Sequence, residues 1–600
     1  MTGSLKKLNT YFKKYLGTII LGSVFLVASN FFLVWIPIFI RRTIDEVAAL
    51  ESKGGGSFDG LAEVLFSSQA GAILAENALM LVGAVVASGL LLFATRQTLI
   101  VTSRKIEFDL RNDVFDKLLE LPQRFFSEFN KGEIYVRATE DISKVREYFG
   151  PAFMYTVNTL SRAGFVIAMM IIVSPELTFW ALLPLPLLSG FAYWISGYIN
   201  THSRIIQEQY SNVAGRAQEA FSSIRLIKAY NREDYEQNRF EDESESYRKK
   251  KLRLDLVESL FHPGLNFLIG ISIILVIWKA GQYVIEGTLT IGNIVEFVVY
   301  VAYLTWPVAS LGYTVNRFQR SMASWNRVDQ VLTEKVEISD NNRTDQSVKE
   351  IEGSIEFVDV SFKYPGAEVY AVKNINLKVN AGQNVAIVGR TGSGKSTLVQ
   401  LIPRLFDPTK GTILIDDIDI KTIPVKKLRA EIGFVPQDTF LFSDSIGENI
   451  AFGTEEASEE QIHAAAEKAQ VRENIMDFDK KFETMLGERG ITLSGGQKQR
   501  TAIARALIRD PKIIILDDSL SAVDTKTEEA ILQHLREELK GRTTIMISHR
   551  ISTIKDADII YYMEEGTIKE HGTHDELLQK KGRYSAMYKK QLLEEELAEI

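Results

Sequence analysis

The sequence predicts an α-helical transmembrane domain of six membrane helices with long cytoplasmic extensions, followed by an α/β domain of the P-loop type. Two observations support this fold class. Six apolar runs in the first half are long enough to cross a hydrocarbon core of ~30 Å. In the second half, Gly389–Ser396 matches the pattern G-x-x-x-x-G-K-[ST] between an expected strand and an expected helix. We therefore place a membrane domain at 1–330, a linker at 331–352 and a nucleotide-binding domain at 353–600.

Composition excludes several classes of function. The net charge of −8 and the pI near 5.7 give no basic surface for nucleic acid. The chain has no cysteine, which excludes disulfides, thiolate metal sites and cysteine nucleophiles. Apolar residues make up 46% of the chain and are concentrated in the first half, as a membrane domain requires.

The first apolar run, Gly17–Ile40, follows four lysines near the N-terminus. It exceeds the core of a signal peptide, which is about 7–15 residues, and no small-residue cleavage site ends it. We therefore interpret it as a membrane helix with its basic end in the cytoplasm. The other expected spans are Asn77–Val101, Pro151–Val173, Thr178–Tyr198, Leu260–Trp278 and Ile294–Gly312.

The connections between the spans indicate their orientation. Ser174–Leu177 is a tight turn between spans three and four, whereas long polar segments follow spans two and four. Six spans return both termini to one side, and the long segments project to that side. They are rich in Lys and Arg mixed with acids, which favours the cytoplasm, although Arg41 and Arg42 at the outer end of span one run against this rule.

The long segments are expected to be helical. Ser203–Leu256 is almost free of Gly and Pro, so it should extend the membrane helices into the cytoplasm. Within these segments, Ser222–Arg232 and Gly132–Asp141 are candidates for contact with the downstream domain. For each of them alone, an ordinary solvated helix is the alternative.

Four ionisable residues stand in or near the spans: Arg96, His262, Lys279 and Glu296. Charge in lipid is costly, so such groups are expected to face a bundle interior or a wet cavity. Arg96 and Lys279 can extend from helix ends to the interface. Glu296, one turn into span six, is the best candidate for lining a cavity.

The phosphate-binding pattern has a physical basis in its glycines. Gly389, Gly392 and Gly394 let the backbone turn tightly and point its N–H groups inward, and the following helix N-terminus adds positive charge. Lys395 is expected at the β- and γ-phosphates and Ser396 at Mg²⁺. For the pattern alone, a chance match is the alternative.

Two further motifs support this interpretation. Lys512–Asp517 is a continuous apolar stretch typical of a buried parallel strand, and it ends in a carboxylate. Such a carboxylate lies at the ligand crevice of an open α/β sheet, so we predict that Asp517 organises Mg²⁺. Leu493–Gln497 places a Gly-Gly turn before a basic amphipathic helix and can bind a second phosphate.

Gly389–Ser396, Gln437, Leu493–Gln497, Asp517, Ser521–Asp524 and His549 stand in the order of the ATP-binding cassette (ABC) ATPases, which the second half of the chain resembles. With six spans ahead of it, the whole chain resembles the half-size exporters of that superfamily. The resemblance implies ATP and Mg²⁺ as cofactors. The ATP-binding residues that it implies are Tyr364, Gly389, Arg390, Thr391, Gly392, Ser393, Gly394, Lys395, Ser396, Thr397, Ser494, Gly495, Gly496, Gln497 and Asp524, and the Mg²⁺ ligands are Ser396, Gln437 and Asp517.

The resemblance also implies individual roles. Tyr364 stacks on adenine, Gln437 senses Mg²⁺ and contacts the membrane domain, and His549 hydrogen-bonds the γ-phosphate. Gly487–Gly490 touches the cytoplasmic coupling helices. Two cassettes sandwich two ATP molecules, so Ser494–Gln497 caps the nucleotide of the other subunit, and Asp524 lies across that interface.

One position departs from the family pattern. A glutamate that polarises the attacking water normally follows the Mg²⁺-binding aspartate, and here that position holds Asp518. The two acids have similar pKa values, but Asp518 is one methylene shorter, and a misplacement of ~1 Å can cost ~10²-fold in rate. We expect catalytic roles for Asp518, His549 and Gln437, with slow turnover in this chain's own pocket.

The expected function is therefore ATP-driven export of a small hydrophobic or amphipathic substrate across the cytoplasmic membrane. The weak pocket resembles one subunit of the heterodimeric bacterial multidrug exporters, and a slow homodimer is the alternative. Both termini and the ATP-binding domain are expected in the cytoplasm. Two other classes are a nucleotide-gated channel or regulatory membrane subunit, and a soluble cassette ATPase, which the six spans and the acidic balance oppose.

Overall fold

The computed structural model describes residues 2–54, 68–348, 350–487, 490, 493–519, 533–548 and 550–599. The chain forms two compact units. A membrane unit comprises Met1–Leu119 and Gly132–Thr333, and a nucleotide-binding unit comprises Glu120–Lys131 and Glu334–Ile600. A short segment from the first half of the chain thus belongs to the second unit.

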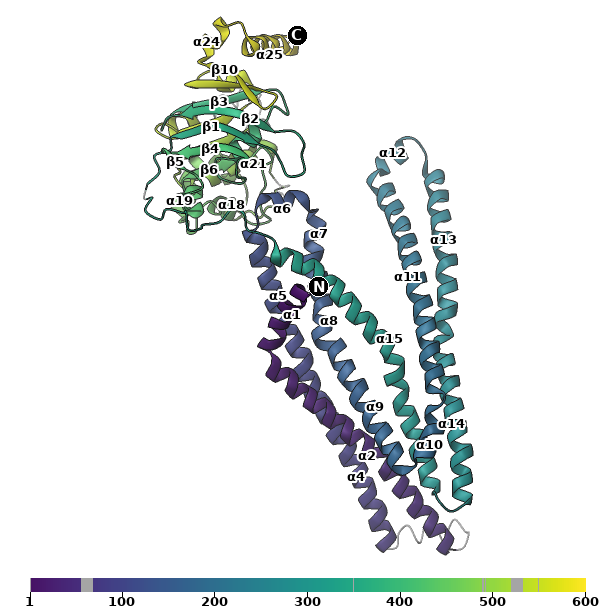
Figure 1. Ribbon diagram of the computed structural model, residues 1–600. Helices are drawn as coiled ribbons and strands as arrows, with labels where there is room; N and C mark the ends of the chain where they lie inside the picture. The colour runs from purple at the N-terminus through teal and green to yellow at the C-terminus, as the bar shows by residue number, and fades with distance from the viewer. Residues whose placement is uncertain are drawn as a thin grey trace. The chain divides into compact units, whose positions relative to one another are not determined.

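The described part of the membrane unit is helical, with several long helices joined by shorter ones (Figure 1). They are α1 (Thr2–Lys14), α2 (Leu16–Gly54), α4 (Ser68–Thr95), α5 (Val101–Glu120), α7 (Lys131–Val136), α8 (Ile142–Glu147), α9 (Phe153–Val173), α10 (Pro175–Leu182), α11 (Leu185–Ser222), α12 (Ile224–Ala229), α13 (Glu233–Ser259), α14 (Phe261–Ile285) and α15 (Ile291–Thr333). Three π-helical turns, η1 (Arg96–Ile100), η2 (Arg137–Asp141) and η3 (Tyr148–Ala152), interrupt this series.

The six predicted spans are confirmed. Among the described residues, six helical segments are long and apolar enough to cross a membrane: Leu16–Ala49, Gly71–Glu120, Lys131–Val173, Pro175–Ser222, Glu233–Ile285 and Ile291–Thr333. Each of them contains one predicted run. The segments are longer than the runs because the helices continue past the apolar stretch, as the composition of Ser203–Leu256 predicted.

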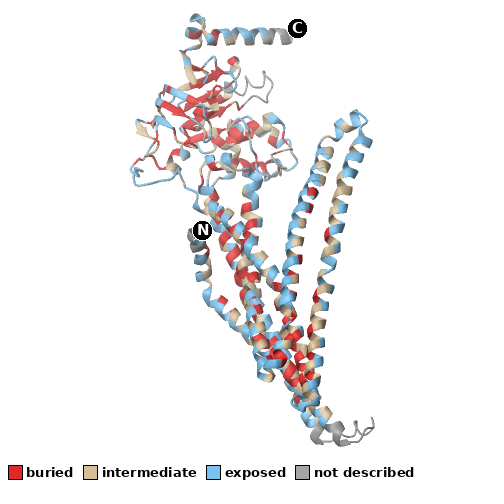
Figure 2. Ribbon diagram, turned by 45° about the vertical axis from the view of Figure 1, so that its right-hand side comes forward, coloured by how far each residue is buried: buried red, intermediate tan, exposed pale blue. Residues whose placement is uncertain are grey.

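The helices α11 and α13 run side by side as a hairpin that α12 closes at one end (Figure 1). Exposed and half-buried residues cover most of this hairpin (Figure 2). Polar side chains join its two arms instead of a continuous apolar core. Gln209 accepts a hydrogen bond from Lys250 Nζ (2.7 Å), and Arg216 pairs with Glu236 (2.7 Å).

The nucleotide-binding unit contains two sheets. The first has the order β2-β1-β4-β5 and is antiparallel, with β1 (Ile355–Phe362), β2 (Val372–Val379), β4 (Lys410–Ile415) and β5 (Ile418–Asp419). The second has the order β10-β9-β3-β8-β7-β6, with β3 (Asn384–Gly389), β6 (Ile432–Val435), β7 (Ile513–Asp517), β8 (Thr543–Ile547), β9 (Ile559–Glu564) and β10 (Thr567–Gly572). It is parallel except for β10.

The unit also contains ten helices among its described residues. They are α6 (Gln123–Glu128), α16 (Lys395–Gln400), α17 (Val425–Ala430), α18 (Ile446–Ala451), α19 (Glu459–Lys468), α20 (Arg472–Met476), α21 (Gly495–Leu507), α23 (Ile551–Ile554), α24 (His574–Gln579) and α25 (Arg583–Glu599), with the 3₁₀ turn η4 (Lys481–Glu483). Of these, α16, α17, α21 and α24 contact strands of the second sheet. Strands β7 and β8 are buried along their whole length, as apolar parallel strands covered on both faces should be. The buried residues gather around these strands (Figure 2).

The segment Gly132–Asp141 lies in the membrane unit, and its contact with the downstream domain stays a prediction. Glu120–Lys131, and not Gly132–Asp141, belongs to the nucleotide-binding unit. Its helix α6 buries Phe125, and Arg124 Nη1 donates to Glu337 Oε1 (2.7 Å) within the same unit. Asp141 is instead fully buried in the membrane unit, where Arg327 Nε of α15 donates to its carboxylate (2.7 Å).

Candidate functional site: a nucleotide pocket and a membrane cavity

The carboxyl ends of four parallel strands meet at one edge of the larger sheet. The register pairs Ile387 of β3 with Ile547 of β8, and Ile547 with Asp517 of β7. Strand β6 lies next to β7, so Gln437, two residues beyond β6, reaches the same edge. Ligands of open α/β sheets bind at this edge.

The phosphate loop follows β3 and leads into α16. Three of its glycines have backbone angles in the left-handed region: φ is +151° at Gly389, +81° at Gly392 and +97° at Gly394. A Cβ atom at Gly389 would lie 2.1 Å from Met563 O, and one at Gly394 would lie 2.4 Å from Ala371 O. Only glycine fits these two positions, so the loop conformation is fixed by its sequence.

Lys395 is buried and folds back on its own loop. Its Nζ donates to the carbonyl oxygens of Gly389 (2.9 Å) and Arg390 (3.1 Å). Burial lowers the pKa of Lys395, and the carboxylates of Asp517 and Asp518 oppose this shift. A phosphate group beside Lys395 would favour the charged ammonium in the same way.

The acidic side of the pocket contains the groups that could hold Mg²⁺. The buried Asp517 accepts a hydrogen bond from Ser396 Oγ (3.1 Å), so a hydroxyl and a carboxylate already face each other. Gln437 Nε2 donates to Asp518 Oδ2 (3.4 Å). Asp518 itself has a left-handed backbone (φ +48°) and its N–H donates to Ile547 O (2.9 Å). Oxygen ligands of this kind are the ones that Mg²⁺ prefers.

A cavity of about 320 Å³ joins these groups. It is lined by Tyr364, Ala371, Thr391, Gly392, Gly394, Lys395, Ser396, Thr397, Gln437, Asp517, Asp518 and Ile547. Tyr364 OH lies 3.1 Å from Thr397 Oγ1, and its ring packs against Phe362 and Phe406. The sequence did not single out Ala371 or Ile547, because neither carries a chemical signature.

Other predicted site residues do not line this cavity. Gly389 and Arg390 shape the loop through their carbonyl groups, and the Ser393 side chain is buried beneath it. Ser494–Gln497 begins α21, where Ser494 and Gln497 form a reciprocal capping box (3.3 and 2.9 Å). Asp524, His549 and the rest of Ser521–Asp524 lie outside the described residues, as do Glu488 and Arg489 of Gly487–Gly490.

The membrane unit has a cavity of about 740 Å³. Its lining mixes aromatic, amide and charged side chains from α8, α9, α11, α13, α14 and α15. They are Glu147, Tyr155, Ser196, Ile199, Asn200, Glu258, Phe261, His262, Leu265, Asn266, Thr305, Trp306, Ser310, Gly312, Tyr313, Asn316, Arg317 and Arg320. Arg317 lies over the Tyr313 ring (4.5 Å) and pairs with Glu147 (3.5 Å). Of the four ionisable residues predicted for the spans, only His262 lines this cavity.

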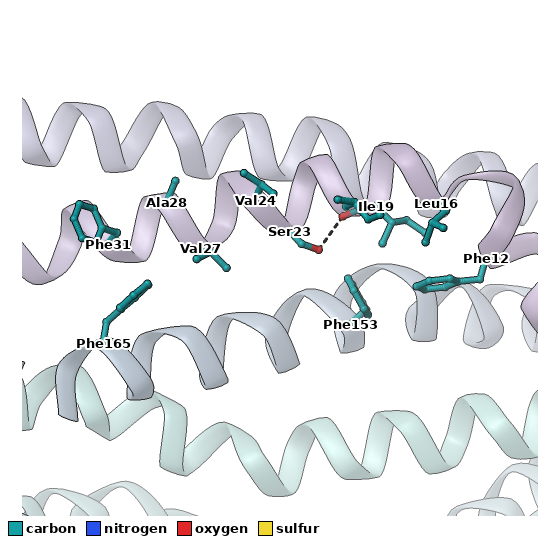
Figure 3. Close-up of a pocket in the computed structure, with 11 residues that line it drawn as sticks. Phe12, Leu16, Ile19, Ser23, Val24, Val27, Ala28, Phe31, Phe153 and Phe165 are labelled. Carbon is teal, nitrogen blue, oxygen red and sulfur yellow. Dashed lines mark hydrogen bonds between the residues drawn. The ribbon is translucent and has the colours of Figure 1, made fainter. Parts of the chain in front are cut away.

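A second, apolar groove of about 590 Å³ lies between α2 and α9 and reaches Phe12 of α1 (Figure 3). Phe12, Phe31, Phe153 and Phe165 mark its ends, and Ser23 is its single polar lining residue. The Ser23 hydroxyl already donates to Ile19 O (2.8 Å), so this groove presents no free polar group to a ligand.

Glu296 does not line the cavity, which corrects the sequence prediction. Its side chain is fully buried and pairs with Arg41 of α2 (3.0 Å). Tyr300 OH donates to the same carboxylate (3.1 Å), and so does Asn293 Nδ2 (3.3 Å). Of the two arginines at the outer end of span one, Arg41 is thus explained as the partner of a buried acid and not as a topology signal.

Comparisons with known proteins agree with this architecture. Residues 19–308 match the family model described as the ABC transporter transmembrane region, and residues 372–521 match the model described as ABC transporter. The probable multidrug resistance ABC transporter ATP-binding/permease protein YheI of Bacillus subtilis is 33% identical over 99% of this chain and 98% of its own length. The chain belongs to the ABC transporter family. The multidrug resistance-like ATP-binding protein MdlA of Escherichia coli is 35% identical over 89% of this chain and 90% of its own length.

A solved structure shares the whole fold. A bacterial Atm1-family ABC exporter with ATP bound aligns with a TM-score of 0.76 at 26% identity, covering 97% of this chain and 99% of that one. The chain is therefore a half-size ABC exporter of the cytoplasmic membrane, with six membrane helices and a cytoplasmic ATP-binding domain that couples hydrolysis to transport. Half-size exporters work as dimers, so this chain is one half of the transporter.

Proposed function

We propose that this chain is the slow-site half of a heterodimeric exporter of amphipathic compounds. ATP with Mg²⁺ binds at the phosphate loop, with Ser396, Asp517 and Gln437 toward the metal and Tyr364 toward the base. One observation carries the dimeric part of this proposal. The nucleotide cavity is lined by residues between Tyr364 and Ile547 that do not include Ser494–Gln497, which supports a second subunit as the source of that loop.

The slow site rests on Asp518. Its carboxylate borders the cavity and approaches Gln437 at 3.4 Å, the position from which a side chain would orient the attacking water. A glutamate would reach about 1.5 Å further, the length of one C–C bond. Since reaction rates fall ~10²-fold for a displacement of ~1 Å, the shorter acid should hydrolyse ATP slowly.

The amphipathic cargo rests on the membrane cavity. Aromatic rings such as Trp306 and Tyr313 stand beside amides such as Asn200 and Asn316 and beside the Arg317–Glu147 pair. Asn316 donates to Asn200 (3.1 Å), so these groups partly satisfy one another, but a purely apolar compound would cover them without replacing their contacts with water. The names of YheI and MdlA refer to multidrug resistance, which agrees with amphipathic compounds as a class.

Hydrolysis by the purified chain alone tests the slow site. We expect turnover well below the ~10 s⁻¹ that is typical of enzymes. Asp518→Glu should raise it by about 10- to 100-fold. Asp518→Asn keeps the size but removes the charge and should lower turnover further. Rapid turnover by the unaltered chain, or no gain in Asp518→Glu, would overturn the slow-site assignment.

Disulfide cross-linking distinguishes the heterodimer from a homodimer. Because the chain has no cysteine, only the introduced thiols can react. One variant carries Thr391→Cys in the phosphate loop and a second carries Ser494→Cys at the start of α21. If copies of this chain sandwich ATP, mixing the two variants with MgATP gives a disulfide-linked dimer. We expect none, because the natural counterpart is a different subunit. An ATP-dependent dimer would favour the slow homodimer.

A further inference from the structure

Arg162 is a charged residue in the apolar helix α9, which spans Phe153–Val173. Placing an isolated cation there costs several kcal/mol unless a partner compensates it, so such a residue normally has a function. The sequence analysis did not single it out, although an arginine inside an apolar run is a visible signal.

The structure gives the Arg162 guanidinium one hydrogen bond, and Tyr303 of α15 lies near enough to interact with its charge. Arg162 Nε donates to Asn30 Oδ1 of α2 (3.3 Å). Asn30 is almost fully buried, and its Nδ2 donates to Asn158 Oδ1 (3.0 Å) and to Ser161 Oγ (2.7 Å). These two bonds fix the amide so that its oxygen faces the arginine.

Within the part of the chain that the structure describes, the guanidinium makes no other hydrogen bond. Arginine carries five N–H donors, and one of them is satisfied by Asn30. No described carboxylate forms an ion pair with Arg162, and the residue remains partly exposed. A planar guanidinium with free terminal nitrogens matches a phosphate or carboxylate group that binds through two oxygens.

Arg162 stands on the helix face that leads from the membrane cavity. Tyr155, seven residues earlier, lines the cavity, and Thr159 hydrogen-bonds Ser310 (3.1 Å), which also lines it. Positions i, i+4 and i+7 share one face of a helix, and seven residues span ~10 Å. Arg162 therefore lies about two turns beyond the cavity wall, along the same face.

Glu296 is a charged residue of the membrane unit that is fully compensated by neighbouring side chains. That acid has Arg41, Tyr300 and Asn293 as partners and no exposed side-chain surface. Arg162 has the amide oxygen of Asn30 and the nearby Tyr303, but no carboxylate among the described residues, and its side chain is partly exposed. The Glu296 arrangement is typical of a structural ion pair. The Arg162 arrangement is typical of a binding site for an anionic ligand.

We propose that Arg162, held by Asn30, is the binding group for the anionic head of an amphiphile that enters from the membrane cavity. The ligand class is an apolar body with a phosphate or carboxylate group. This inference rests on the proposed export of amphipathic compounds and restricts that class to anions.

Binding of dodecyl phosphate to the full chain in phosphatidylcholine nanodiscs tests the proposal without needing hydrolysis or a partner subunit. We expect Arg162→Gln to weaken binding by about 10- to 100-fold, the range for loss of a charged hydrogen-bond pair. Arg162→Lys should keep most of the affinity. The matched control is Arg96→Gln, which removes an exposed arginine of the same unit and should bind like the unaltered chain.

A chemical rescue guards against misfolding of the neutral variant. Because the chain has no other thiol, Arg162→Cys can be modified at one position only. Adding an aminoethyl group restores a positive charge and should restore binding, whereas a methylthio group should not. MgATP affinity of each variant reports on the fold and on the ATP-binding function separately from the anion site.

Two further measurements identify the ligand. Dodecyltrimethylammonium should bind the unaltered chain more weakly than dodecyl phosphate. Part of the phosphatidylcholine is then replaced by anionic phosphatidylglycerol. Dodecyl phosphate binding should weaken if bilayer lipids use the site and stay unchanged if the site takes only free amphiphiles. Both results support the anion site. Equal binding by Arg162→Gln and the unaltered chain, or an equal loss in Arg96→Gln, would overturn it and leave Arg162 as a link between α9 and α2.

Discussion

The phosphate loop takes most of its binding geometry from eight consecutive residues, whereas the membrane cavity takes its polar side chains from six helices. In the loop, backbone angles at Gly389 and Gly394 fix the shape, and β3 and β7 bring the carboxylate beside it. In the cavity, Glu147 and Arg317 meet although 170 positions separate them (317 − 147 = 170). Local geometry can therefore be predicted from a motif, and long-range geometry cannot.

The largest effect is expected on MgATP affinity, from a substitution in the nucleotide pocket. Lys395→Ala removes the cation that we expect at the β- and γ-phosphates. Charged hydrogen bonds contribute ~1.5–3 kcal/mol each, so MgATP affinity should fall about 10²- to 10⁴-fold. Titration with a fluorescent ATP analogue measures it. Lys410→Ala, an exposed lysine of the same unit, is the control. If Lys395→Ala binds MgATP within threefold of the unaltered chain, the assignment of this pocket to ATP is wrong.

The next largest effect is expected from breaking the buried Glu296–Arg41 ion pair of the membrane unit. Glu296→Ala leaves Arg41 without its partner, and breaking a buried ion pair costs ~3–5 kcal/mol. Thermal unfolding in detergent should show a clear loss of stability. Glu296→Gln keeps partners for Tyr300 and Asn293 and should lose less, and Glu286→Ala, at an exposed acid, should change little. An unchanged unfolding temperature in Glu296→Ala would show that the pair is not structural.

A smaller effect sharpens the definition of the cavity. With no natural thiol in the chain, Asn266→Cys on the cavity wall and Ser272→Cys, buried on the same helix, can each be labelled alone. A water-soluble maleimide should react with position 266 at least about tenfold faster, since a buried site reacts only through local opening. Equal rates would mean that the cavity is not open to water.

The smallest effect is a pH dependence in the nucleotide-binding unit. Arg542 donates to Asp510 (2.5 Å) and holds the pKa of that exposed carboxyl below its usual value. Such a pair stabilises the fold above the unfolded pKa of ~3.9 and loses its effect as pH falls through the native pKa. Asp510→Asn should therefore cost a few tenths of a kcal/mol at neutral pH. This difference should shrink below pH ~4 in thermal unfolding, and a constant difference would contradict the assignment.

The residues themselves show where prediction succeeds. Gly389–Ser396, Asp517 and the six spans follow from local composition, because strand ends and apolar lengths determine their places. The partner of Glu296 could not be predicted, since Arg41 lies 255 positions away (296 − 41 = 255) and only helix packing joins them. The segment Glu120–Lys131 was missed because burial of Phe125 depends on tertiary contacts, although its paired phenylalanines were visible.

The exposed tip of the α11–α13 hairpin bears on the abundance of this protein in the cell. Phe221, Ile224, Leu226 and Tyr230 are all exposed there, at 76%, 45%, 60% and 71%. Apolar side chains left in water attract chaperones and proteases. If the second subunit of the proposed dimer covers this tip, a chain synthesised in excess would present it uncovered and be degraded, and the abundance of the chain would follow the supply of that subunit.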